Sequence, residues 1–208
     1  IDLEMWDRES ALATPVDLEP RCFHLALVGG LRAQKNHRVL VEAVAVLRPA
    51  ERSDLRVWFV GGETGAPETA EEIRRAIDHH RLGSIFRVLP ATPRVAALMR
   101  RLDALVLPSA FEGFPNVLLE AMASRLPCVA SRVGDVPNML VEGETGFLVE
   151  SGDVRGLAEA LRRLRALGPE GRREMGERAR KTVEARYRID TVAAQYLSLY
   201  RALVEARR

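Results

Sequence analysis

The residues best suited to chemistry lie in two loops that follow buried apolar runs. In the first loop, Gly29 and Gly30 would let the backbone approach a ligand closely. Lys35 stands just before a helical pattern and would place a point charge there, which suits a phosphate. Only Lys35 and Lys181 among the 31 cationic side chains are lysines, so this loop lysine stands out. An ordinary turn with a surface lysine is the alternative.

The second loop holds Glu112 and leads into a helical pattern with Glu120 one turn inside it. Asn116 is expected to be the N-cap of this helix, which would place in its first turn the amides of Val117, Leu118 and Leu119. A carboxylate here would repel a phosphate, so its natural partner is a pair of hydroxyls on a sugar or ribose. Amides for an anion and two carboxylates for diols together predict a nucleotide-sugar site.

Other interpretations of these residues stay open. Glu120 would also favour the helix dipole, and Glu112 would also suit a solvated loop. A general acid/base pair for glycoside hydrolysis is the least favoured. The first loop matches neither a G-x-G-x-x-G fingerprint nor a P-loop, which disfavours dinucleotide binding of that kind. The four histidines lack metal-ligand spacing, so we predict no metal site.

Composition narrows the class of protein. The 208 residues are 47% hydrophobic and 29% charged, which excludes disorder and predicts one sizeable core. Cys22 and Cys128 are too few for a disulfide framework. No run approaches the roughly 18 apolar residues of a membrane span, and the first residues resemble no signal peptide, so a cytoplasmic location is expected.

Charge is unevenly distributed along the chain. Residues 151–208 hold 14 basic and 8 acidic side chains, against 17 and 21 in residues 1–150, for a total net charge of +2. A basic tail would suit a nucleic acid, an anionic membrane or another domain. A solvated helical face is the equally weighted alternative.

Hydrophobic patterning supplies the elements that must position the two loops. Six short apolar runs predict strands at 24–30, 55–60, 85–89, 103–107, 128–131 and 146–150. Amphipathic or helical patterns predict helices at 37–48, 67–81, 95–102, 116–124, 154–167, 169–186 and 189–206. Strands that are apolar on both sides and alternate with helices predict an α/β fold, a doubly wound, parallel six-stranded sheet with extra C-terminal helices.

This fold fixes where a ligand would bind. Such sheets bind ligands outside the carboxyl ends of their strands. The loops to search are therefore 29–36, 61–67, 90–93, 108–116 and 132–138. We expect a linker at 1–20, a Rossmann-like domain at 21–187 and a C-terminal helix at 188–208.

Four ordered stretches resemble one family of enzymes. Residues 112–123 (EGFPNVLLEAMA) resemble the E-x7-E motif of group 1, or family 4, retaining glycosyltransferases. Residues 29–36, 103–109 (DALVLPS) and 143–149 (GETGFLV) resemble other stretches of the same family, in the same order and spacing over roughly 22–201.

The resemblance implies a GT-B architecture, two Rossmann-like domains facing across a cleft. This chain would be the C-terminal domain, which holds a nucleotide-diphosphate sugar (NDP-sugar), with an N-terminal domain as its partner. The whole enzyme would transfer a hexose with retention, without cofactor, metal or nucleic acid, and with possible peripheral membrane contact. We expect this chain alone to bind donor weakly and turn over little.

The resemblance also assigns roles. Lys35 would stabilise the departing diphosphate, Glu112 would bind hydroxyls of the transferred sugar, and these two are the catalytic residues. Glu120 would bind the ribose, while Val88 and Leu89 would contact the base. The other donor-binding positions are Gly29, Gly30, Gly113, Phe114, Pro115, Asn116, Val117 and Leu118.

The chain departs from the family at two places. The family usually has an arginine where this chain has Gly30, so Arg32 or the other domain would have to supply that charge. It more often has a glycine and a glutamate where this chain has Asp135 and Asn138. Alternative functions are a GT-B epimerase or phosphorylase domain, or a non-enzymatic Rossmann-like module; nucleic-acid binding is the least favoured.

Overall fold

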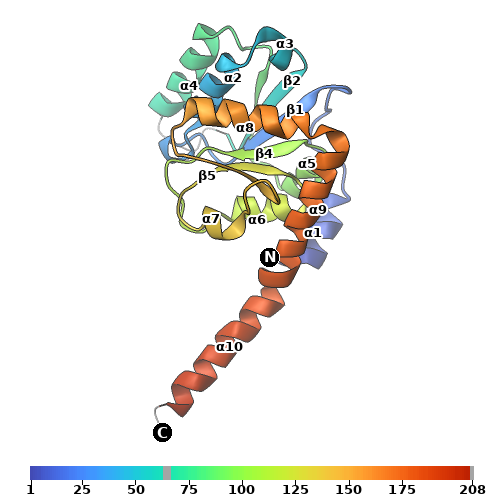
Figure 1. Cartoon of the computed structure of the whole chain (residues 1–208), viewed down its shortest axis with the longest axis vertical. Coiled ribbons are helices and arrows are strands. Elements are labelled where there is room, and N and C mark those ends of the chain that lie inside the picture. The colour runs from blue at the N-terminus through green and yellow to red at the C-terminus, as the bar shows by residue number, and fades with distance from the viewer. Residues whose placement is uncertain (63–66, 207–208) are drawn as a thin grey trace.

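The computed structural model describes residues 1–62 and 67–206 and contains a six-stranded sheet. The strands are β1 (Phe23–Val28), β2 (Leu55–Val60), β3 (Phe86–Leu89), β4 (Ala104–Leu107), β5 (Cys128–Ser131) and β6 (Gly146–Val149). They lie in the order β3-β2-β1-β4-β5-β6, and the pairing between each two neighbours is parallel. The predicted doubly wound parallel sheet is confirmed (Figure 1).

Helices occupy most of the connections between strands. The α-helices are α1 (Leu3–Ser10), α2 (His37–Val46), α3 (Pro49–Arg52), α4 (Pro67–His79), α5 (Val95–Met99), α6 (Asn116–Ala123), α7 (Val136–Met139), α8 (Val154–Ala166), α9 (Gly168–Arg186) and α10 (Ile189–Glu205). A short 3-10 helix, η1 (Ala33–Lys35), precedes α2. The helix expected over 37–48 ends earlier, at Val46. Pro49 then begins α3, where the Glu51 carboxylate accepts a hydrogen bond from the Arg48 amide at 2.7 Å.

The sheet separates two apolar layers. Successive side chains of a strand point to opposite faces, so Leu25 and Leu27 of β1 pack with α2, α4 and α8, while Ala26 packs on the other face. That second face is covered by α1, α5, α6 and α7. Helix α9 reaches both layers, because Met175 belongs to the first and Ala179 to the second.

The strand order places a switch point between β1 and β4. The helix that follows β1, α2, packs on one face of the sheet, and the helix that follows β4, α6, packs on the other. The connections therefore diverge and leave a crevice at the carboxyl ends of these two strands. The loop that holds Lys35 (29–36, the lysine loop) follows β1, and the loop that holds Glu112 (108–116, the glutamate loop) follows β4. The fold therefore brings the two loops to this crevice.

Helix α1 lies inside the segment that we expected to be a linker. Leu3, Trp6 and Ser10 are buried at helical spacing, and the Trp6 indole donates to Ser124 Oγ at 2.9 Å. Asp7 accepts two hydrogen bonds of 2.8 Å from Arg180, which α9 buries against the body. Residues 3–10 are thus a packed part of the domain, and the rest of the predicted domain division stays a prediction.

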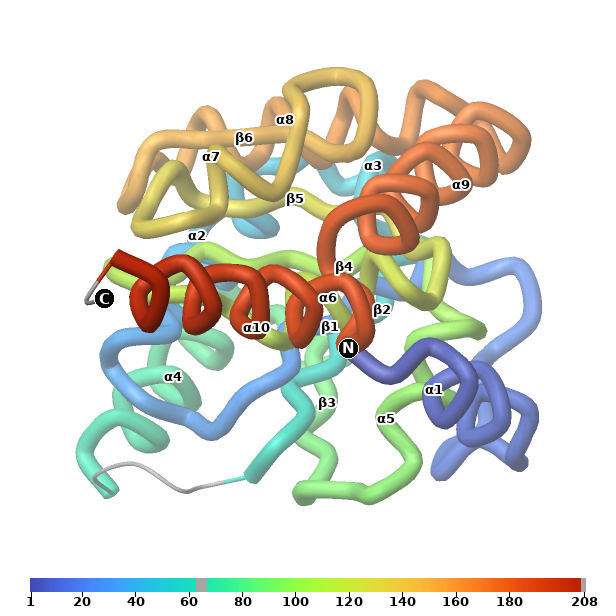
Figure 2. Tube along the Cα trace, turned by 90° about the horizontal axis from the view of Figure 1, so that it is seen from below, coloured from blue at the N-terminus to red at the C-terminus, as the bar shows by residue number. Residues whose placement is uncertain are grey.

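Helix α10 leaves the body of the molecule at the end of α9 (Figures 1 and 2). None of its described residues is buried, and its exposed apolar side chains are Ile189, Tyr196, Leu197, Leu199, Tyr200, Leu203 and Val204. In the part of the chain that the structure describes, no helix is long and apolar enough to cross a membrane.

His37 is a buried polar residue at the start of α2. Its side chain is 1% exposed, neither ring nitrogen has a hydrogen-bond partner within the described structure, and the ring lies edge-on against Phe59 with 4.8 Å between centroids. Burial, and secondarily the charge of Lys35, lower the pKa of His37 from 6.5 to about 4. The folded state therefore holds this ring neutral.

Replacing His37 should remove a component of acid sensitivity. Between pH 6.5 and about 4 the unfolded chain binds a proton that the folded chain excludes, so the free energy of unfolding falls as the pH falls. The lowered pKa accounts for about 2 kcal/mol of this fall between pH 7 and pH 5. Urea unfolding of His37→Leu should lack that component, whereas His79→Gln, at the exposed end of α4, should retain it. An unchanged pH dependence in His37→Leu would contradict the assignment.

Candidate nucleotide-sugar site

The loop after β1 brings Lys35 back over its own first glycine. The Gly29 amide donates to the Val60 carbonyl at 2.7 Å, and its φ of +147° is a conformation that side chains rarely adopt. A Cβ on Gly29 would lie 3.0 Å from Cε of Lys35, so the lysine stem covers this glycine. A Cβ on Gly61 would lie 2.7 Å from the Gly29 carbonyl carbon, so the next loop is packed equally tightly. Glycines thus hold the end of the lysine stem close to the backbone.

Lys35 and Glu112, the two predicted catalytic residues, meet directly. Lys35 Nζ donates to Glu112 Oε1 at 2.8 Å, and the Ser109 hydroxyl donates to the same oxygen at 2.7 Å. The side chain of Glu112 is 8% exposed and that of Lys35 is 18% exposed. Neither bond uses Glu112 Oε2. The resulting ion pair crosses the switch point and neutralises both charges.

Backbone contacts fix the two loops against each other. The Ala110 amide donates to the Gln34 carbonyl at 2.8 Å, and the Gln34 side-chain amide donates to the Phe111 carbonyl at 3.0 Å. Ser109 is fully buried, and its carbonyl accepts from the Ser151 hydroxyl at 3.3 Å. The ion pair is therefore one contact of a wider seam rather than an isolated surface pair.

The loop after β5 (132–135) packs against the backbone of the glutamate loop, and the closest approach is at Gly134. Gly134 has φ +51°, and a Cβ there would lie 1.9 Å from the Glu112 carbonyl oxygen and 2.7 Å from that of Gly113. The next amide, of Asp135, donates to the Gly113 carbonyl at 3.0 Å. Sequence reasoning included loop 132–138 in the search but did not single out Gly134. A glycine after an apolar run was the only local signal, and it does not reveal which backbone lies against it.

The start of α6 differs from our expectation. We predicted Asn116 as the N-cap, but Asn116 is the first helical residue and Pro115, in an extended conformation, holds the cap position. No side chain caps this helix, and the Leu118 amide donates to the Pro115 carbonyl at 3.0 Å. The fixed φ of proline suits the extended cap residue, so the helix begins at Asn116, one residue earlier than an Asn116 cap would give. The first turn consequently presents the Asn116 and Val117 amides, with Asn116 exposed.

Glu120 lies one turn inside α6 and is half-buried. Burial raises the pKa of its carboxyl above the usual range. Among the described residues no cation or donor pairs with this carboxylate, so its acceptor oxygens are available to hydroxyl donors. A partly desolvated carboxylate without a cation suits a neutral diol better than a phosphate.

The remaining predicted positions lie along the same edge. Leu89 ends β3, its carbonyl accepts from the Gly61 amide at 3.0 Å, and Val88 beside it is 51% exposed. They lie two strands away from β1, which leads into the loop of Lys35. Of the loop expected at 61–67, residues 63–66 lie outside the described residues.

The two departures from the family also have defined places. Arg32 is exposed at the turn before η1. The side chain of Asn138 donates to Asp135 Oδ1 at 3.1 Å and is exposed. Neither side chain contacts the Lys35–Glu112 pair.

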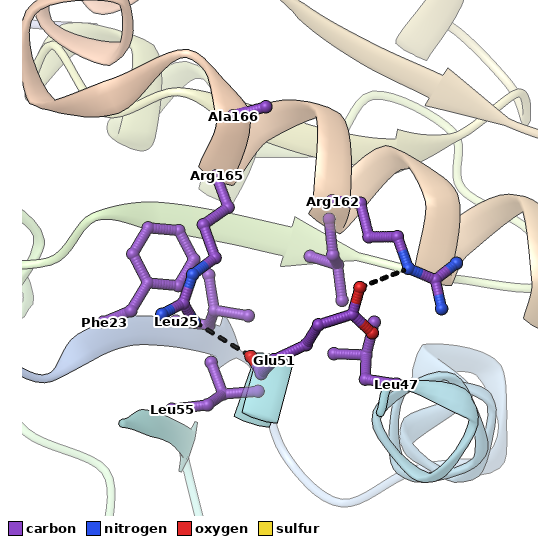
Figure 3. A pocket seen from close by; sticks show the side chains of 9 residues that line it. Phe23, Leu25, Leu47, Glu51, Leu55, Arg162, Arg165 and Ala166 are labelled. Carbon is purple, nitrogen blue, oxygen red and sulfur yellow. Dashed lines mark hydrogen bonds and ion pairs between the residues drawn. The ribbon is translucent and has the colours of Figure 1, made fainter. Parts of the chain in front are cut away.

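A separate cavity lies at the opposite edge of the sheet, where β1 and β2 begin (Figure 3). Its lining is Phe23, Leu25, Leu47, Glu51, Leu55, Leu161, Arg162, Arg165 and Ala166. Glu51 bonds Arg162 at 3.1 Å and accepts at its carbonyl from Arg165 at 2.9 Å. The Arg48 guanidinium, first among several donors, lowers the pKa of Glu51 to about 2. The Glu51–Arg162 ion pair and the hydrogen bond from Arg165 tie α3 to α8, and the cavity lies at the opposite end of the strands from the predicted site residues.

Comparison with known proteins places the chain in a family. The family model described as "Glycosyl transferases group 1" matches residues 22–166. The D-inositol 3-phosphate glycosyltransferase of Corynebacterium glutamicum (strain R) is 36% identical over 180 residues, covering 85% of this chain and 42% of that protein. The chain therefore belongs to the group 1 glycosyltransferase family. It spans less than half the length of these curated relatives.

Solved structures agree on the fold. A glycosyltransferase from Rickettsia africae ESF-5 superposes with a TM-score of 0.88 at 20% identity, covering 98% of this chain and 55% of that one. HepE of Anabaena, in complex with UDP-glucose, superposes with a TM-score of 0.82 at 19% identity, covering 97% of this chain and 56% of that one. The expected Rossmann-like half of a GT-B glycosyltransferase is confirmed.

Substituting Gly134 should disturb the site from behind. Gly134→Ala adds a Cβ against the Glu112 and Gly113 carbonyls, so we expect it to cost about 1–3 kcal/mol beyond the backbone strain of a left-handed alanine. Gly143→Ala is the matched control, because Gly143 has φ +75° and nothing within 4 Å of the added methyl. Urea unfolding of the two variants measures the difference. Equal losses of unfolding free energy in the two variants would show that the backbone of Glu112 and Gly113 moves to accommodate the added methyl without cost.

Proposed function

We propose that this chain binds the nucleotide-sugar donor of a retaining glycosyltransferase that transfers a hexose to an acceptor. The observation that carries the proposal is the Lys35–Glu112 pair, 2.8 Å long, at the switch point beside the uncapped start of α6. A cation, free helix amides and a second carboxylate at Glu120 offer one partner to each part of an NDP-sugar.

The anion-binding half of the site comes from Lys35 and backbone amides. A diphosphate placed over Gly29 would meet the ammonium of Lys35, whose stem already lies on this glycine. The amides of Asn116 and Val117 at the start of α6 would complete the cradle, because helix N-termini favour anions. Gly113, Phe114 and Leu118 would support it from the same turn. Once the donor is bound, charge that develops on the leaving diphosphate would be stabilised by groups already in place.

The two carboxylates would take hydroxyls. Once the diphosphate engages Lys35, Glu112 would exchange its ammonium partner for hydroxyls of the transferred hexose, with Ser109 still holding Oε1. Glu120 would accept from the ribose, and Val88 with Leu89 would contact the base. Support for a uridine nucleotide comes only from the fold likeness to HepE, which holds UDP-glucose in its own structure.

The longer protein would supply the acceptor site. The relatives are more than twice as long as the part that this chain matches. Helix α10 presents an apolar stripe that the described body of the molecule leaves exposed, formed by Ile189, Tyr196, Leu199, Tyr200 and Leu203. An N-terminal GT-B domain packed on this stripe would cover it and close the cleft over the donor. The isolated chain would therefore bind donor weakly and turn over little, and transfer with retention would belong to the two-domain protein.

Nucleotide titration of single-residue variants tests the donor site. By calorimetry we expect one of UDP, ADP and GDP to bind, and Lys35→Met to weaken that diphosphate about tenfold or more, or about 1.4 kcal/mol. Glu120→Gln should weaken the binding of this nucleoside diphosphate and also of the same nucleoside without phosphates, because the Glu120 carboxylate would bind the ribose. Lys181→Met, which removes the other lysine of the chain at an exposed position of α9, is the control and should bind as wild type.

The outcomes separate the proposal from its alternatives. Heat from none of the three nucleotides would support a non-enzymatic module and end the donor proposal. If Lys35→Met binds the nucleotide with unchanged affinity, the diphosphate binds elsewhere than at the β1–β4 crevice.

The apolar stripe of α10 should matter only in the longer protein. Leu199→Ser with Leu203→Ser should lower transfer about tenfold or more there, because the stripe would lose apolar burial against the N-terminal half. The same double variant of the isolated chain should bind nucleotide as wild type. Arg201→Ser, between the two leucines in sequence, serves as the control. Full transfer activity in the double variant would refute the docking role.

A further inference from the structure

Tyr187, the C-cap residue of α9, contacts segments that are far apart in the sequence. Its ring lies 5.9 Å from the ring of Phe114, measured between centroids, and its hydroxyl donates to the Asn138 carbonyl at 3.3 Å. Its own carbonyl accepts from the backbone nitrogen of Ile1 at 2.7 Å. The side chain is half-buried at the centre of these contacts.

The first set of contacts leads to the donor loop. Phe114 is 47% exposed, and Tyr187 is the aromatic side chain that packs on it. Asn138 belongs to α7, and that helix begins beside Asp135, whose amide donates to the Gly113 carbonyl. Tyr187 therefore touches the loop 112–116 directly and also through the loop that supports it.

The second set of contacts fixes the junction from which α10 begins. The helical conformation is interrupted between α9 and α10 at Tyr187 and Arg188, and Arg188 is extended with ψ 144°. The Ile189 amide donates to the Ile1 carbonyl at 3.0 Å and the Ile1 nitrogen donates to the Tyr187 carbonyl, so two backbone bonds join Ile1 to this junction. Figure 1 shows the start of the described chain, marked N, beside the junction. The course of α10 is thus fixed at the residue that also packs on Phe114.

We propose that Tyr187 is a positioning residue: it holds the loop 112–116 in place and couples that loop to the α9–α10 junction. Its role toward the donor rests on the proposed function. Because coupling between two sites is reciprocal, an ordered loop steadies the junction, and a fixed junction orders the loop for the donor. In the two-domain protein this would connect the donor's arrival to the helix whose apolar stripe faces the other half.

Hydrogen exchange of the ligand-free chain tests the contact without any nucleotide. Tyr187→Ala should speed exchange of the Leu118 and Asp135 amides about tenfold, since their acceptors are the Pro115 and Gly113 carbonyls of the loop that loses the ring packed on Phe114. Tyr187→Phe keeps this ring and loses only the bond to the Asn138 carbonyl, so it should restore slow exchange of these two amides. Tyr200→Ala is the control, because Tyr200 is exposed and its ring contact is with Tyr196 on the same helix.

A nucleotide tests the coupling itself. With saturating UDP, ADP or GDP, whichever binds, we expect exchange at 186–190 to slow about threefold in wild type, although none of these residues is among the predicted donor-binding positions. In Tyr187→Ala the same nucleotide should bind several-fold more weakly and leave 186–190 unchanged, while Tyr187→Phe behaves as wild type.

Each outcome decides a separate point. Unchanged exchange of the Leu118 and Asp135 amides in Tyr187→Ala would overturn the positioning role whether or not a nucleotide binds. A bound nucleotide that leaves 186–190 unprotected in wild type would overturn the coupling. Absence of binding by all three nucleotides would overturn the proposed function and the donor coupling with it, and the ligand-free arm would still decide whether Tyr187 orders the loop.

Discussion

The site depends on one ion pair that crosses the sheet's switch point. Lys35 and Glu112 are 77 positions apart, yet Nζ and Oε1 lie 2.8 Å from each other because β1 and β4 are neighbours in the sheet. With side chains 18% and 8% exposed, neither charge would be tolerated here without a partner of opposite sign or a ligand. The pair therefore ties the two loops together, and Gly29, Gly61 and Gly134 lie where an added Cβ would meet neighbouring atoms at 3.0 Å or less.

Much of this arrangement could be predicted, because it follows from patterns local in sequence. Apolar runs alternating with helical periods predict a parallel sheet, and its carboxyl edge must collect the loops of Gly29 and Glu112. That Lys35 and Glu112 would bond to each other could not be predicted, since each was matched to a ligand group. Only the folded backbone shows that their side chains reach one another before any ligand does.

The elements that were wrong or missed share a physical cause. Helix α1 has too few apolar residues to stand out, and its burial depends on Ser124 and Arg180, more than 100 residues away. Asn116 has the better N-cap propensity, but the extended Pro115 already occupies the cap position. Gly134 is needed because of the backbone of Glu112, a contact that no pattern within its own loop reveals. Tertiary contact decided each case.

The electrostatics of the resting site explain how two carboxylates can share a crevice with an anion. Glu112 is neutralised by Lys35, and burial raises the pKa of Glu120, which weakens its preference for the charged form. A diphosphate arriving at Lys35 would thus exchange one anionic partner for another instead of meeting an unscreened negative pair. Under the proposed function, Glu112 would be released from its cation but still bonded to Ser109, and its carboxylate would be left to accept hydrogen bonds from sugar hydroxyls. Selectivity for the sugar would then depend on the same ion pair that joins the two loops.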